Sequence, residues 1–138
     1  MLRVRNACGS CLLACVFAVS ACGGESREFT ASELVNELNE NGAALRLEGA
    51  LPNDQENVEV YELSLSRSDS PTPDDHAESG VTVIIAEDEE LAEAEFGRCE
   101  ASVSLTCFRV ANGVLLLSDD EPSTLAKVEA AVRAMESE

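Results

Sequence analysis

Cysteine is the residue whose chemistry is most distinctive in this sequence. Four of the six cysteines fall within the first 22 residues, in or beside an apolar run. The other two, Cys99 and Cys107, lie close together in the second half of the chain. A thiol can be acylated, oxidised to a disulfide or bound to a metal, so the sequence around each cysteine must decide between these chemistries.

The first 21 residues have the pattern of a secretory signal peptide. Arg3 and Arg5 form a short basic start, and an apolar stretch follows over roughly 11–21. This stretch is too short to cross a bilayer, which needs about 20 apolar residues. A basic start, a short apolar run and small residues at its end are typical of an exported protein, so residues 1–21 are expected to be removed. The removed segment would include three of the cysteines, Cys8, Cys11 and Cys15.

The end of this run resembles the lipobox of bacterial lipoproteins. The residues Val19-Ser20-Ala21-Cys22 are an aliphatic residue, two small residues and a cysteine. The resemblance implies that the Cys22 thiol receives a diacylglycerol and that a peptidase cuts before it. Two or three acyl chains anchor a protein stably to a membrane. The expected location is therefore the outer face of the cell membrane or a periplasm-facing envelope membrane. An ordinary signal peptide, cleaved near Ala21 with a free Cys22 thiol, is the alternative.

With Cys22 acylated, Cys99 and Cys107 remain as a pair in an oxidising compartment, where disulfides persist. They lie between a predicted helix end and a predicted strand, and a short loop can be closed there if the Cα atoms come close enough. We therefore predict a structural disulfide between them. A reactive thiol is the less favoured alternative, because the pair forms no CxxC motif and no activating base is evident.

A cation site is the other chemistry that the side chains could support. The run 74–78, Asp-Asp-His-Ala-Glu, mixes a histidine with carboxylates, but its spacing matches no calcium-binding loop. A solvated acidic loop is the simpler interpretation. Two further acidic runs, 87–90 and 119–121, are interpreted as charges at helix starts, where they favour the helix dipole. A weak Ca²⁺ or Mg²⁺ site built jointly from these runs is the alternative, and no metal or other cofactor is predicted.

Motifs, composition and charge limit the remaining function classes. HExxH, GxSxG, the P-loop and the dinucleotide-binding glycine pattern do not occur, so no catalytic residue is predicted. The 138 residues suffice for one domain. Acidic residues number 27 and basic residues 9, giving a net charge of −18, which argues against a nucleic-acid partner. The hydrophobic content of 45% is too high for a disordered acidic tail.

The first element after the leader is a clearly signalled helix. Residues 22–28 are a short polar segment, which is expected to form a flexible tether. Thr30 can cap a helix and Glu33 completes a capping box, while Phe29 and Leu34 occupy the positions of a hydrophobic staple. Apolar residues then recur at helical spacing as far as Asn41-Gly42, a pair that is expected to end the helix.

Hydrophobic patterning predicts the other elements. Strands are expected over 45–48, 58–65, 81–86, 105–110 and 114–117, with helices over 88–96, ending at Gly97, and from the acidic run before Pro122 to the C-terminal end. A phase change between Val60 and Tyr61 indicates a bulge or burial on two sides. Asn112-Gly113 between two apolar runs predicts a hairpin, because both residues tolerate a positive φ.

The order α-β-β-β-α-β-β-α predicts an α+β fold. We expect a mainly antiparallel sheet of four to five strands with two to three helices on one face, in a single domain over 29–138. The helix start Phe29–Leu38 and the run Cys107–Asn112 are similar to small uncharacterised lipoproteins of high-GC bacteria, a likeness that implies no assigned activity. The expected function is a membrane-anchored, non-catalytic binding or accessory module whose partner is another envelope protein. A lipoprotein that binds a divalent cation or a small solute through its acidic surface is the alternative.

Overall fold

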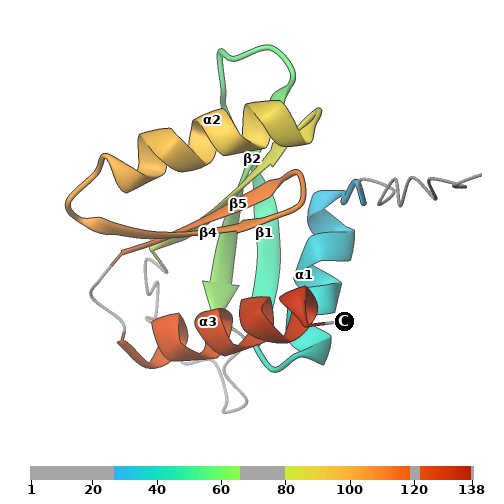
Figure 1. The fold of residues 1–138 in the computed structure, drawn as a ribbon, viewed down its shortest axis with the longest axis vertical. Coiled ribbons are helices and arrows are strands. Elements are labelled where there is room, and N and C mark those ends of the chain that lie inside the picture. Colours follow the sequence, from blue (N-terminus) through green and yellow to red (C-terminus); the bar gives the residue numbers. More distant parts are fainter. Residues whose placement is uncertain (1–26, 66–79, 119–121, 138) are drawn as a thin grey trace, which may run out of the picture.

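The structure, a computed structural model, describes residues 27–65, 80–118 and 122–137 of the chain (Figure 1). The predicted α+β class and the predicted order of elements are confirmed. The elements are α1 (Ala31–Glu40), β1 (Leu45–Leu51), β2 (Val58–Leu65), β3 (Val81–Ala86), α2 (Glu89–Glu100), β4 (Leu105–Val110), β5 (Gly113–Ser118) and α3 (Pro122–Glu136).

The five strands form one antiparallel sheet in the order β1-β2-β3-β5-β4. β3 lies at its centre, between β2 and β5, while β1 and β4 form the two edges. β3 and β5 are almost continuously apolar, and Val83 and Leu115, which pair across them, are fully buried. A strand of this composition is stable only where both faces of the sheet are covered.

α1 and α3 cover one face of the sheet, and α2 covers the other (Figure 1). The larger core joins Leu34 of α1 and Val128 of α3 to Leu115 of β5. The smaller core joins Ala92 of α2 to Val114 of β5. Because successive residues of a strand point to opposite faces, the neighbours Val114 and Leu115 belong to different cores. Two of the three helices thus share one face, as predicted, and α2 adds a third layer.

The predicted capping box at the start of α1 is present. The Glu33 amide donates to Thr30 Oγ1 at 3.3 Å, and the Thr30 amide donates to Glu33 Oε2 at 2.9 Å. The Thr30 amide, and after it the Thr30 hydroxyl, hold the pKa of the Glu33 carboxyl below its ordinary value, because both donate to the charged form. The stabilisation from this charge is therefore full at neutral pH and is lost as falling pH protonates Glu33.

Loss of this cap should measurably destabilise the domain. We expect Thr30→Ala to lower the free energy of unfolding by about 1 kcal/mol, because the Glu33 amide loses its acceptor. Urea unfolding measures the effect, and Thr30→Ser, which keeps the hydroxyl, is the matched control. A neutral Thr30→Ala would show that α1 begins at another residue.

β1 is longer than predicted, because it continues through a bulge. Its register with β2 shifts between Leu47 and Gly49, so Glu48 is the extra residue. β2 itself pairs with β3 without interruption. Val60 and Tyr61 are both half-buried and point to opposite faces, so the phase change in β2 reflects burial on two sides and not a bulge.

The prediction that the second helix ends at Gly97 is wrong. α2 continues to Glu100 and is capped by Ala101. A Cβ at Gly97 would meet nothing within 4 Å, so this glycine is a weak helix former in an open position. The additional turn carries Cys99 against the sheet, where it is only 4% exposed. Tertiary burial of that turn overrides the local preference for a stop.

The predicted hairpin between β4 and β5 forms, but its turn uses a different residue in the left-handed conformation. Ala111 has the positive φ, 50°, that we expected of Asn112 and Gly113. Gly113 instead starts β5 where α1 approaches closely, and a Cβ there would lie 2.4 Å from Leu34 Cδ2. The glycine is therefore required for packing between α1 and the sheet.

Candidate functional site

The structure describes only part of the residues predicted to carry chemistry. Cys22, the acidic loop 74–78 and the acidic run 119–121 lie outside the described residues. Cys99, Cys107 and the acidic run 87–90 lie within them. Two described regions remain as candidate sites: the disulfide at one end of the sheet and the N-terminal entry of the chain at the other.

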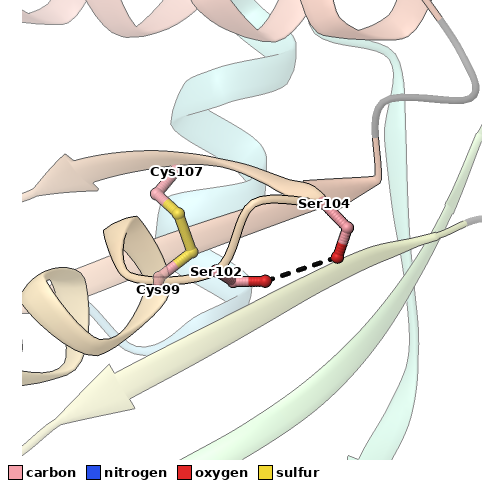
Figure 2. Close-up of a disulfide and its surroundings, with 4 residues drawn as sticks. All are labelled: Cys99, Ser102, Ser104 and Cys107. Atoms are coloured by element: carbon pink, nitrogen blue, oxygen red, sulfur yellow. Dashed lines mark hydrogen bonds between the residues drawn. A yellow bond between two sulfur atoms is a disulfide. The ribbon is translucent and has the colours of Figure 1, made fainter.

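The predicted disulfide is present. The sulfur atoms of Cys99 and Cys107 are bonded, and their Cα atoms are 6.1 Å apart, an ordinary distance for a disulfide (Figure 2). Cys99 comes from the last turn of α2, and Cys107 lies on β4 opposite Leu116, which packs in the smaller core. The bond therefore joins the end of α2 to β4, an edge strand of the sheet, on the face that α2 covers.

We call the segment closed by this bond, residues 99–107, the disulfide loop. It carries a fully exposed aliphatic side chain. Val103 is 101% exposed. It lies between Ser102 and Ser104, whose hydroxyl oxygens are 3.3 Å apart (Figure 2). The disulfide and this hydrogen bond restrain the loop, so it would lose little conformational freedom on contact with another molecule.

The N-terminal entry of the chain is clamped to the opposite end of the sheet by Asn112. This side chain is 3% exposed. Its Oδ1 accepts from the Phe29 amide at 2.7 Å, and its Nδ2 donates to the Phe29 and Ala86 carbonyls, each at 3.0 Å. Arg27 adds an ion pair with Glu37 at 3.0 Å and lies 4.7 Å from the centroid of the Phe29 ring. The entry point of the chain is therefore fixed relative to the sheet.

We call this region the tether end and define it as residues 27–30, 54–57, 86–90 and 111–112. Backbone bonds join its parts: the Ala86 amide donates to the Asn112 carbonyl and the Glu87 amide to the Asn57 carbonyl, both at 2.9 Å. Its surface is acidic. The exposed carboxylates are Glu28, Asp54, Glu56, Glu87, Asp88, Glu89 and Glu90. Among the residues in this definition, Arg27 carries the one positive charge.

Part of this acidity serves the start of α2. Asp88 is the N-cap, and its carboxylate accepts from the Leu91 amide at 2.8 Å. Glu89 and Glu90 occupy the first turn, where negative charge is favourable to the helix dipole. The interpretation of the run 87–90 as charges at a helix start is confirmed.

A buried carboxylate on α2 was not predicted from the sequence. Glu95 is 5% exposed and pairs with Arg98. With its amide oriented to satisfy both groups, Gln55 donates to Glu95 Oε1 at 3.0 Å and accepts from Arg98 Nη1 at 3.1 Å. Glu95 shares a helix face with Ala92 and Cys99, a spacing that could have indicated its burial. These contacts tie the loop between β1 and β2 to α2 and give Glu95 a structural role.

The described ranges contain no arrangement that suggests a metal centre or a membrane span. Across 27–65, 80–118 and 122–137, no group of three or more His, Cys, Asp or Glu side chains is placed to hold a metal ion. Within the same ranges, every helix is too short or too polar to cross a membrane.

Comparison with known proteins does not assign the chain to a family. No protein-family model, no curated protein and no solved structure matches it. The resemblance to bacterial lipoproteins therefore rests on the residues of this sequence: the run Val19–Cys22, the helix start Phe29–Leu38 and the run Cys107–Asn112.

Proposed function

We propose that this protein is a bacterial lipoprotein: a non-catalytic interaction module that acyl chains on Cys22 hold at the outer face of an envelope membrane. The observation that carries the proposal is the Cys99–Cys107 disulfide. Disulfides persist in oxidising compartments and are rare in the cytosol. The bond lies far from the leader in the sequence, so it supports export independently of the lipobox pattern.

The distance between the lipid and the folded domain supports an anchored module. Seven residues of chain lead from Cys22 to Phe29, where the fold begins. Even a fully extended chain of that length spans at most about 25 Å. The domain would therefore stay close to the bilayer, and its local concentration toward a protein in the same membrane would be high.

Two buried polar side chains of the described residues have structural roles. Asn112 joins Phe29 to β3, and Glu95 joins α2 to the loop before β2. Within 27–65, 80–118 and 122–137, no buried side-chain nitrogen or oxygen lacks a hydrogen-bond partner. The proposed binding surface is therefore sought among exposed residues, of which Val103 in the disulfide loop is apolar.

Acylation is tested directly by removing its acceptor. We expect Cys22→Ala to abolish incorporation of an alkyne-labelled fatty acid, because the alanine side chain offers no sulfur to acylate. The protein should also retain its leader, as measured by mass spectrometry of the product. The double variant Cys99→Ala/Cys107→Ala is the matched control and should incorporate the label normally. Normal processing and labelling of Cys22→Ala would overturn the proposal.

A further inference from the structure

The tether end and the disulfide loop lie at opposite ends of the sheet. α2 begins at the tether end with Asp88 as its cap and ends at Glu100, one residue after Cys99, where the disulfide loop starts (Figure 1). A helix of its 12 residues is about 18 Å long. β4 then returns from Leu105 to Val110, beside the 111–112 turn. The length of α2 therefore separates Asp88 at the tether end from Cys99 at the start of the disulfide loop.

The chain can reach its lipid only from the tether end. Asn112 holds both the amide and the carbonyl of Phe29, so the entry point cannot slide along the domain without breaking buried hydrogen bonds. A flexible tether of seven residues has an r.m.s. reach of about 15 Å, less than the length of α2, so few of its conformations leave the far end against the bilayer. The point of attachment thus gives the anchored domain a preferred direction.

Charge prevents the near end from lying flat on lipid. The tether end carries seven exposed carboxylates against Arg27, and such a surface is repelled by anionic headgroups within the Debye length of about 8–10 Å. Between its two cysteines the disulfide loop has one charged residue, Glu100, and an exposed apolar side chain, Val103. This repulsion opposes close contact between the tether end and anionic lipid, so the direction of the domain comes from its point of attachment and not from charge.

We propose that the fold orients the anchored domain, with the tether end facing the bilayer and the disulfide loop held outward, away from the lipid. This inference rests on the proposed acylation of Cys22 and adds which surface meets the membrane. The Asn112 clamp sets the direction, and the acidic side chains keep the domain from adhering to the headgroups. Val103 is then displayed on the side that other envelope proteins can approach.

Energy transfer to labelled lipid tests the orientation. The acylated protein is inserted into phosphatidylcholine vesicles that carry an acceptor dye on a small fraction of headgroups. Azidophenylalanine, coupled to a donor dye, replaces Glu89 in one variant and Val103 in the other, because both side chains are exposed. We expect the transfer rate from position 89 to be several times that from position 103.

A longer tether supplies the matched control. Insertion of about 20 Gly and Ser residues between Gly24 and Glu25 lets the domain turn freely, because such a linker has a reach of about 25 Å. The difference between the two labels should then largely disappear. Equal or reversed transfer in the vesicle-bound parent would overturn the orientation alone. Protein without acyl chains, which does not join the vesicles, would overturn the proposed function instead.

Discussion

Asn112→Ala is expected to lower the free energy of unfolding by about 3 kcal/mol, a large share of the stability of a small domain. The substitution removes three hydrogen bonds and leaves the Phe29 amide and the Phe29 and Ala86 carbonyls without their partner. A buried polar group that loses its partner costs about 1–3 kcal/mol, and partial access of water to the cavity reduces the sum. The urea midpoint measures the change, provided that the denaturant dependence stays that of the parent.

Asn53→Ala is the matched control for this prediction. Asn53 makes the same kinds of contact, since its Nδ2 donates to the Val58 carbonyl at 2.8 Å and its Oδ1 accepts from the Gln55 amide at 3.0 Å. Asn53 is exposed, however, and water can replace both bonds. We expect it to cost less than about 1 kcal/mol. An equal effect of the two substitutions would show that the Asn112 clamp does not hold the chain entry in solution.

Asn112 also shows where sequence reasoning reached its limit. Its position before Gly113, between two apolar runs, predicted the hairpin, and the hairpin is present. Its main contact, however, is Phe29, which lies 83 residues away in the sequence. No local pattern encodes a contact at that separation, because the partner is set by how α1 docks on the finished sheet. The same docking explains Gly113, which admits Leu34 rather than forming the turn.

The correctly predicted features depend on contacts that are local in the sequence. The capping box of Thr30 and Glu33 spans three residues, and the Asn41-Gly42 stop follows within one helix length. The order of the strands along the chain followed from runs of apolar residues in the same way. The end of α2 at Glu100 and the bulge at Glu48 depend on packing between elements, and both were missed.

The same distinction between local contacts and packing between elements applies to the candidate site. The signal-peptide pattern and the pairing of Cys99 with Cys107 follow from residue type and spacing, and the second of these is present in the structure. The placement of the disulfide loop and the tether end at opposite ends of the sheet does not follow from spacing. It requires α2 to cross the sheet face opposite α1 and α3, which became evident only from the fold.

Removal of the disulfide should produce the second large effect. We expect Cys99→Ala/Cys107→Ala to lower the free energy of unfolding by about 2–3 kcal/mol, because the unfolded chain regains the freedom of a short closed loop. Urea unfolding of the parent and the variant, both without reductant, measures the difference. Addition of dithiothreitol should shift the parent toward the variant and leave the variant unchanged.

Where the destabilisation acts can also be stated. The bond ties the last turn of α2 to β4, and that turn contains Gly97, so its helical conformation depends on tertiary contact more than on propensity. Without the bond, amide hydrogen exchange should increase first from residue 97 through the disulfide loop, before it increases at the tether end. Exchange that rises equally at Asn112 would show that the disulfide stabilises the whole domain evenly and does not specifically order the loop that presents Val103.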